Sequence, residues 1–163
     1  MVMIVDMDAC SGCQACVTAC SLAKANVFSP TKSSISVRKV ESRCLSIPVL
    51  CEHCDNLPCQ AVCPTGAISR DPDTGIVVID PDLCGGCENC RWACPFGGPL
   101  TIKMEDGVAV KCDLCEGSPA CAEVCHQGAI AYMPASPSAV HRKWRCAEER
   151  MKALLSLAVR RAM

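Results

Sequence analysis

Four cysteines in the segment Leu83–Phe96 constrain the fold of this chain more than any other feature. The segment reads LCGGCENCRWACPF, so its cysteines follow the spacing C-x2-C-x2-C-x3-C and a proline follows the last one. Two residues between thiols let a tight loop wrap one face of an inorganic cluster, and Gly85 and Gly86 allow a positive φ in that loop. This spacing is typical of three thiolates that bind one [4Fe–4S] cluster, with the fourth cysteine reaching a second cluster.

Motifs of this kind occur four times along the chain. Their members are Cys10, Cys13, Cys16 and Cys20; Cys51, Cys54, Cys59 and Cys63; Cys84, Cys87, Cys90 and Cys94; and Cys112, Cys115, Cys121 and Cys125. We therefore predict four [4Fe–4S] clusters with four thiolates each, bound through cluster iron. A structural zinc protein is the alternative, but zinc sites usually pair their cysteines by twos. Cys44 and Cys146 lie at no ligand spacing, and we predict that both are small buried hydrophobic residues.

The order of the motifs contains a twofold repeat. Ile4–Cys13 and Val78–Cys87 share the pattern x-x-D-x-D-x-C-x-G-C. Cys51–Ile68 is similar to Cys112–Ile130, which has one inserted residue. The repeat predicts that one structural unit has been duplicated in tandem.

We predict an α+β fold in which a bacterial-type 2[4Fe–4S] ferredoxin-like unit occurs twice, with short strands and helices around the clusters. The first half covers residues 1–75 and the second covers residues 76–133, with the turn residues Asp71–Gly75 between them. Apolar, β-branched or alternating segments predict strands at Met3–Asp6, Ser33–Val40, Ile76–Asp80 and Ala129–Tyr132.

Residues 134–163 form a different segment, which we predict to be an amphipathic helix. Ser136 can cap the helix and Pro137 suits its first turn. Apolar residues then recur every three or four positions, at Val140, Trp144, Ala147, Met151, Leu154 and Ala158. Two interpretations are open: the apolar stripe packs on the chain's own body, or it docks onto a partner subunit.

Composition excludes several function classes. Eighteen of the 163 residues are cysteine and only five are Phe, Trp or Tyr, so inorganic clusters would have to fill much of the core. A net charge of −1 gives no argument for nucleic acid. The sequence begins without a signal peptide and contains no apolar run long enough to span a bilayer. We expect a reducing cytoplasm, where dense cysteine indicates metal rather than the disulfides of a secreted protein.

The sequence offers no separate catalytic set, so we do not expect an enzyme. No phosphate loop or dinucleotide fingerprint is present. His53 precedes Cys54 and His126 follows Cys125, and both are expected to be loop residues or donors that tune a potential rather than ligands. Four clusters in so short a chain must lie near one another, which favours electron transfer.

These motifs resemble those of the four-cluster ferredoxin-like subunits of molybdenum and tungsten oxidoreductases, hydrogenases and formate dehydrogenases. The resemblance covers residues 3–132 and rests on the sequences CEHCDNLPC, CPTGAI and KCDLC, at Cys51–Cys59, Cys63–Ile68 and Lys111–Cys115. The approach IPVL before Cys51 and the exit at Tyr132–Pro134 are most similar to the small iron–sulfur subunit of tungsten-dependent aldehyde oxidoreductase. Ser21 and His126 replace the usual proline after the last cysteine of motifs one and four.

The resemblance implies that distant motifs exchange their last cysteine. The implied ligand sets are Cys10, Cys13, Cys16 and Cys125; Cys112, Cys115, Cys121 and Cys20; Cys51, Cys54, Cys59 and Cys94; and Cys84, Cys87, Cys90 and Cys63. It also implies a large catalytic oxidoreductase subunit as the partner, and a ferredoxin, a flavin-containing subunit or another copy of this chain as the acceptor. The alternatives are a free-standing polyferredoxin and a subunit of a formate dehydrogenase or hydrogenase.

Overall fold

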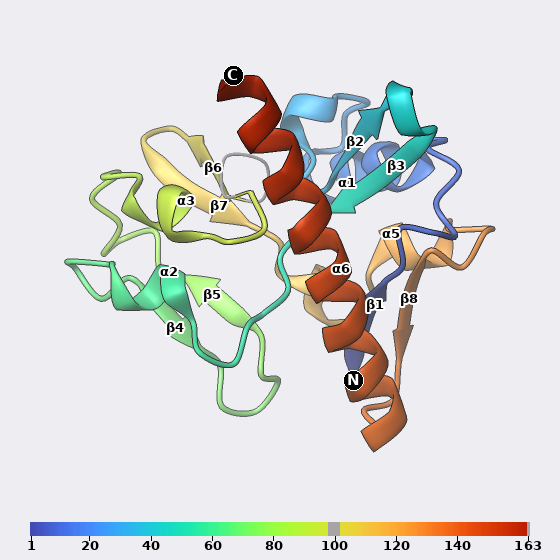
Figure 1. The fold of residues 1–163 in the computed structure, drawn as a ribbon. Coiled ribbons are helices and arrows are strands. Elements are labelled where there is room, and N and C mark those ends of the chain that lie inside the picture. Colours follow the sequence, from blue (N-terminus) through green and yellow to red (C-terminus); the bar gives the residue numbers. More distant parts are fainter. Residues whose placement is uncertain (98–101, 163) are drawn as a thin grey trace.

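The computed structural model describes residues 1–97 and 102–162 (Figure 1). The helices are α1 (Ala15–Ala25), α2 (Pro58–Ala61), α3 (Asn89–Ala93), α5 (Ala120–Glu123) and α6 (Pro137–Ala162), with 3-10 turns η1 (Pro30–Lys32), η2 (Glu41–Arg43) and η3 (Leu114–Gly117). The strands are β1 (Val2–Val5), β2 (Ser36–Val40), β3 (Leu45–Val49), β4 (Ile68–Arg70), β5 (Val77–Ile79), β6 (Ile102–Glu105), β7 (Val108–Lys111) and β8 (Ile130–Met133).

The described strands form four separate antiparallel pairs, and their pairing divides the elements into two groups. β1 pairs with β8, with Met3 opposite Tyr132, although these strands stand at opposite ends of the ferredoxin-like region. β2 pairs with β3, β4 with β5, and β6 with β7. In Figure 1, α1, α5 and the β1–β8 and β2–β3 pairs lie on one side of α6, and α2, α3 and β4–β7 lie on the other. The boundary at residue 75 between two halves stays a prediction.

The four predicted strands are confirmed as β1, β2, β5 and β8, with ends that differ from the predicted ones by at most three residues. The predicted turn at Asp71–Gly75 closes the β4–β5 hairpin, where the backbone N–H of Gly75 donates to the carbonyl oxygen of Asp71 at 2.9 Å. The Asp71 carboxylate accepts the Thr74 backbone N–H at 2.7 Å and holds the turn. The β6–β7 hairpin was not predicted.

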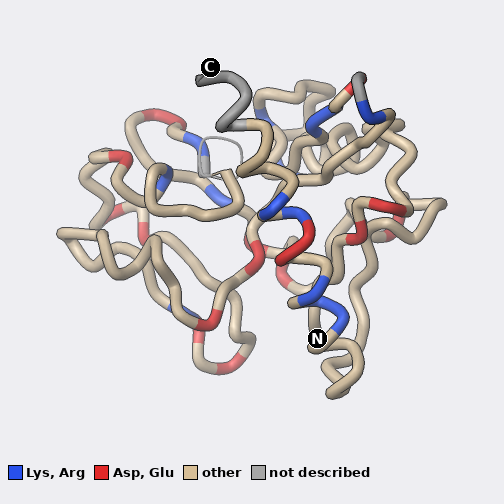
Figure 2. Tube along the Cα trace, viewed as in Figure 1, with Lys and Arg blue, Asp and Glu red and all other residues tan. Residues whose placement is uncertain are grey.

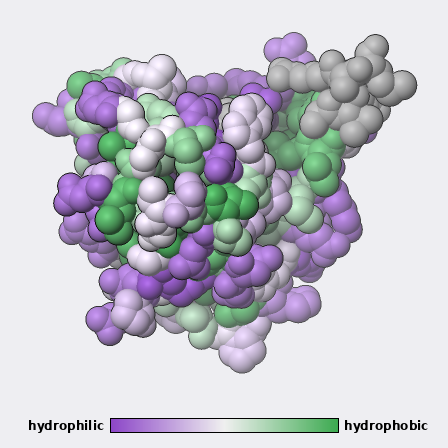
Figure 3. All heavy atoms as spheres, turned by 90° about the vertical axis from the view of Figure 1, so that its left-hand side faces the viewer, coloured by the Kyte–Doolittle hydropathy of each residue, from purple (hydrophilic) through white to green (hydrophobic). Residues whose placement is uncertain are grey.

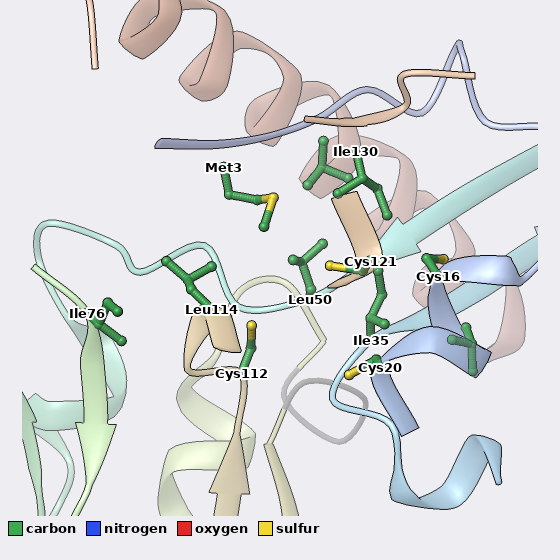
Figure 4. Close-up of a cluster of buried hydrophobic side chains, with 12 residues drawn as sticks. Met3, Cys16, Cys20, Ile35, Leu50, Ile76, Cys112, Leu114, Cys121 and Ile130 are labelled. Carbon is green, nitrogen blue, oxygen red and sulfur yellow. The ribbon is translucent and has the colours of Figure 1, made fainter. Parts of the chain in front are cut away.

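The larger hydrophobic core contains thiols as well as apolar side chains (Figure 4). It gathers Met3, Val5, Val17, Ile35, Leu50, Ile76, Leu114 and Ile130 with Cys16, Cys20, Cys112 and Cys121. A second cluster on the other side of the molecule joins Leu57, Ile68, Val77 and Ala109 to Cys90. The strands and short helices therefore pack around thiols, as the low aromatic content requires.

Helix α6 packs on the chain's own body, but through a face that is shifted from the predicted stripe: Ala139, Cys146 and Arg150 are buried, whereas Val140, Trp144 and Met151 are only partly buried. Ala139 and Cys146 form a buried cluster with Ile4 of β1. Farther along, Leu154 and Leu157 pack against Ile47 and Val49 of β3. The hydroxyl of Ser136 accepts the Ala139 backbone N–H at 3.2 Å, so the predicted cap is present. The side chain of Ala158 lies outside the described part of the chain.

The two remaining cysteines differ in exposure. Cys146 is buried, as predicted. The prediction that Cys44 is buried is wrong, because Cys44 is exposed in the turn between β2 and β3 with φ +50°. A turn that links two paired strands lies at the surface, so it offers its residues no apolar neighbours.

Charged residues of the two signs are mixed along the described part of the chain (Figure 2). Lys and Arg are distributed together with Asp and Glu along the trace (Figure 2). On the face that includes the left-hand side of Figure 1, hydrophobic and hydrophilic residues are interspersed (Figure 3). None of the helices in the described part of the chain combines the length and apolar character needed to cross a membrane.

Candidate functional site

The structure collects the sixteen motif cysteines into four groups, which we number 1 to 4. Three groups each line a cavity. Group 1 contains Cys10, Cys13, Cys16 and Cys125; group 3 contains Cys51, Cys54, Cys59 and Cys94; and group 4 contains Cys63, Cys84, Cys87 and Cys90. Each of these groups combines three cysteines of one motif with the last cysteine of a distant motif.

Group 2 consists of Cys20, Cys112, Cys115 and Cys121. Cys20, Cys112 and Cys121 belong to the same buried cluster (Figure 4). Cys20 and Cys115 lie close enough to Cys121 to raise its pKa, and Cys20 and Cys121 do the same to the pKa of Cys112. The last cysteine of motif one therefore joins the first three cysteines of motif four.

The ligand loops repeat a left-handed backbone turn at equivalent positions. In motif one, Gly12 has φ +74° and Gln14 has φ +62°; in motif three, Gly86 has φ +67° and Glu88 has φ +61°. At Gly86 a side chain would also collide with the backbone carbonyl of Gly107, so the position requires glycine. Turns of this kind aim successive backbone N–H groups into a concavity, which is a recurrent feature of anion and iron–sulfur sites.

Each group contains at least one thiol that accepts a hydrogen bond from a backbone N–H. The pairs are Ile130 to Cys125 in group 1 at 3.3 Å, Ser34 to Cys20 in group 2 at 3.3 Å, His53 to Cys51 in group 3 at 3.4 Å, and Ala109 to Cys84 in group 4 at 3.4 Å. Such donors stabilise a negatively charged sulfur and raise the potential of a cluster bound to it. All four groups therefore share a backbone hydrogen bond to sulfur, although their motifs differ.

Burial makes several of these thiols weaker acids, whereas hydrogen bonds lower the pKa of Cys13 and of Cys63. Burial raises the pKa of Cys16 to about 11 and the pKa of Cys54 and of Cys121 to about 12. The buried Cys112 thiol also has a raised pKa. Because a metal binds the thiolate, iron has to displace these protons, and the positive charge of the iron then replaces them.

The geometry fits iron–sulfur clusters better than the two alternatives. None of the eighteen cysteines, all of which lie among the described residues, forms a disulfide, which excludes a disulfide scaffold as the basis of this fold. Over residues 1–97 and 102–162, no three His, Cys, Asp or Glu side chains converge closely enough to hold a single metal ion. A tetrahedral zinc site with Zn–S bonds near 2.3 Å would need sulfurs roughly 3.8 Å apart.

Basic side chains surround group 3. Arg70 donates to the carbonyl oxygen of Cys54 at 2.5 Å, and the buried Lys111 donates to the carbonyl oxygen of Val77 at 2.5 Å. Arg150 forms a buried ion pair with Glu52, which lies between Cys51 and Cys54 in the sequence. Four bound thiolates and a cluster carry net negative charge, so Arg70 and Lys111 favour occupancy of group 3, whereas the charge of Arg150 is balanced by Glu52.

Sequence reasoning missed these basic residues. Lys111 stands next to Cys112, which was a usable signal because a lysine beside a ligand is placed near the cluster. Arg70 and Arg150 are 16 and 96 residues from Cys54, and no spacing rule connects them to it. His53 is buried and lines the group 3 cavity, and burial lowers its pKa to about 3. His126 is exposed and lines the group 1 cavity.

Thiols, backbone donors and left-handed ligand loops together define an iron–sulfur protein of ferredoxin-like type. The family described as "4Fe-4S dicluster domain" matches residues 42–135. The chain belongs to this family.

Two curated relatives match most of the chain. The chain is 38% identical over 125 residues to the polyferredoxin-like subunit of aliphatic sulfonate oxidoreductase from Pyrococcus furiosus, covering 77% of this chain and 71% of that protein. It is 38% identical over 154 residues to the thiosulfate reductase electron transfer subunit PhsB of Salmonella typhi, covering 86% and 79%. Among solved structures, the active site complex BamBC of benzoyl coenzyme A reductase aligns with a TM-score of 0.47 at 20% identity, over 98% of this chain and 96% of that chain.

Proposed function

We propose that this chain is the electron-transfer subunit of an oxidoreductase complex and carries four [4Fe–4S] clusters. The proposal rests on one observation: the sixteen motif thiols form four groups of four, and in each group a backbone N–H donates a hydrogen bond to a sulfur. Groups 1 to 4 would each hold one cluster, and Cys20, Cys63, Cys94 and Cys125 would be the ligands exchanged between motifs. When bound, the clusters supply one-electron chemistry.

The four groups follow one another in a row, which supports a relay. Cys16 in group 1 lies close enough to Cys121 in group 2 to raise its pKa. In the same way Cys112 of group 2 interacts with Cys51 of group 3, and Cys59 of group 3 interacts with Cys90 of group 4. The protein's own part is to hold, insulate and tune these sites.

The partner is a larger catalytic oxidoreductase subunit, since the chain offers no catalytic set of its own. The aldehyde oxidoreductase with a tungsten or molybdenum pterin is the partner that the motif resemblance favours. A second candidate is an oxidoreductase of sulfur compounds, because the two relatives are named for aliphatic sulfonate oxidoreductase and thiosulfate reductase. The acceptor would be a ferredoxin, a flavin-containing subunit or another copy of this chain.

Metal analysis of anaerobically prepared protein tests the proposal. We expect about sixteen iron atoms and about sixteen acid-labile sulfides per chain, with the brown colour of [4Fe–4S] clusters. A colourless protein containing only zinc would reject the proposal. The large subunit that purifies with the chain would decide between the two partner classes, and a fully loaded monomer without a companion would favour a free-standing polyferredoxin.

A further inference from the structure

The imidazole of His53 is held in one tautomer by the backbone. The N–H of Val77 donates to Nδ1 of His53 at 3.0 Å, and only an unprotonated ring nitrogen can accept such a bond. The proton of the neutral ring therefore lies on Nε2. His53 itself has φ +49°, a conformation in which histidine is enriched among non-glycine residues.

The Nε2–H of His53 has no hydrogen-bond partner among the described residues, although the side chain is only 7% exposed. An unsatisfied buried donor costs about 1–3 kcal/mol, and such groups in native proteins call for an explanation. His53 lines the group 3 cavity together with Cys51, Cys54, Cys59 and Cys94. His53 therefore brings an unsatisfied ring donor to the set of residues that line a site built to hold a cluster.

We infer that His53 donates a hydrogen bond from Nε2 to the cluster of group 3 and raises the midpoint potential of that cluster, without binding iron. The inference rests on the proposed four-cluster function. Ligation is excluded by the same geometry, because Nδ1 is occupied by Val77 and Nε2 carries the proton. His53 then serves group 3 twice, since its backbone N–H also donates to Cys51 Sγ at 3.4 Å.

The direction of the effect follows from charge. Reduction adds one negative charge to a cluster, so a donor stabilises the reduced form more than the oxidised form. Hydrogen bonds to charged groups are the stronger ones. Loss of this donor should therefore lower one midpoint potential and leave the other three in place.

The test is a redox titration of the holoprotein, followed by electron paramagnetic resonance, for the wild type, His53→Leu and His53→Gln. For His53→Leu we expect one midpoint potential to fall by about 59 mV, which corresponds to a tenfold change in the equilibrium constant of a one-electron reduction. The iron content should be unchanged. The His53→Gln amide can accept from Val77 and still donate, so it should restore most of the shift. His141→Leu is the matched control, because His141 is exposed on α6.

A second readout separates a hydrogen bond from a merely structural role. In reduced protein whose histidines carry 15N in the imidazole ring alone, pulsed resonance should detect a weakly coupled ring nitrogen that is present in the wild type and in His141→Leu and absent in His53→Gln. This measurement remains decisive if His53→Leu does not fold. Unmoved potentials with no nitrogen coupling would overturn the inference, and so would the loss of about four iron atoms in His53→Gln. Too little iron in the wild type would instead count against the proposed function.

Discussion

Cys94 is the residue at which the exchange of ligands between motifs can be tested most sharply. It belongs to motif three in sequence, yet it lines the group 3 cavity with three cysteines of motif two. We predict that Cys94→Ala damages the cluster of group 3 and spares that of group 4. The resonance spectrum of reduced Cys94→Ala should therefore match that of Cys54→Ala and differ from that of Cys87→Ala.

The matched control for Cys94→Ala is Cys44→Ala, which removes an exposed thiol that lines none of the three cysteine cavities and should leave all four clusters. If Cys94→Ala instead reproduced the spectrum of Cys87→Ala, each motif would supply its own four ligands and the exchange would be wrong.

Arg150 and Glu52 form an ion pair whose two side chains are each only 1% exposed. Arg150 also donates to the Pro48 carbonyl at 3.3 Å. We predict that Arg150→Met destabilises the holoprotein by about 3–5 kcal/mol, because it leaves the Glu52 carboxylate buried without its partner. For a chain of this size, the unfolding temperature measured by calorimetry should fall by roughly 6 °C or more.

Two further variants test whether the loss of stability in Arg150→Met comes from the unpaired Glu52 carboxylate. Adding Glu52→Gln to Arg150→Met removes the stranded charge and should recover part of the loss. Lys152→Met breaks an exposed pair with Glu148 on the same helix and should leave the unfolding temperature unchanged. Equal losses in Arg150→Met and Lys152→Met would contradict the assignment of a special role to the buried pair.

At the scale of elements, α6 is an integral part of the fold, and two adjacent leucines test this. Leu154 packs against Val40, Ile47 and Val49, whereas Leu155 is 55% exposed. We predict that Leu154→Asp destabilises the protein by about 2 kcal/mol or more, since burial of a leucine contributes about that much. Leu155→Asp should have little effect on the unfolding temperature. Similar behaviour of both variants would mean that α6 does not hold this face against the body.

Elements that are determined by residues close together in the sequence could be predicted, whereas elements that depend on contacts between distant residues could not. Local patterns were enough for β1, β5 and β8 and for the cap of α6. The β6–β7 hairpin also carries a local signal that we did not use: Asp106 and Gly107, with φ +52° and φ +81°, form a two-residue turn between alternating apolar residues. A complete reading of turn chemistry would have predicted it.

Long-range pairings were not accessible in this way. The pairing of Val2 with Met133 joins residues from opposite ends of the ferredoxin-like region, and no local pattern encodes it. The same is true of the site. Spacing identifies sixteen cysteines as ligand candidates, but only the family resemblance suggested which motif receives Cys94. The burial of Arg150 beside Glu52 has no signal in either segment.

At the scale of the whole molecule, the fold depends on what fills the four thiol groups. The described strands form only isolated pairs, and a two-stranded pair is marginal in water without further packing. Thiols make up part of both larger buried clusters, and burial raises the pKa of several of them. Cluster binding and folding should therefore be coupled.

The coupling predicts that removing iron with a chelator unfolds the two sides of the molecule unequally. The side with β4–β5 and β6–β7 has the smaller apolar cluster, and its packing partners include Cys59, Cys63 and Cys84. The other side keeps Ile4, Ile47 and Val49 covered by α6, through contacts that involve no motif cysteine. Hydrogen exchange of the apoprotein should show amides of β4–β7 exposed first and amides of β1 and β3 partly protected. Equal protection on both sides, at the level of the holoprotein, would show that the polypeptide folds independently of its clusters.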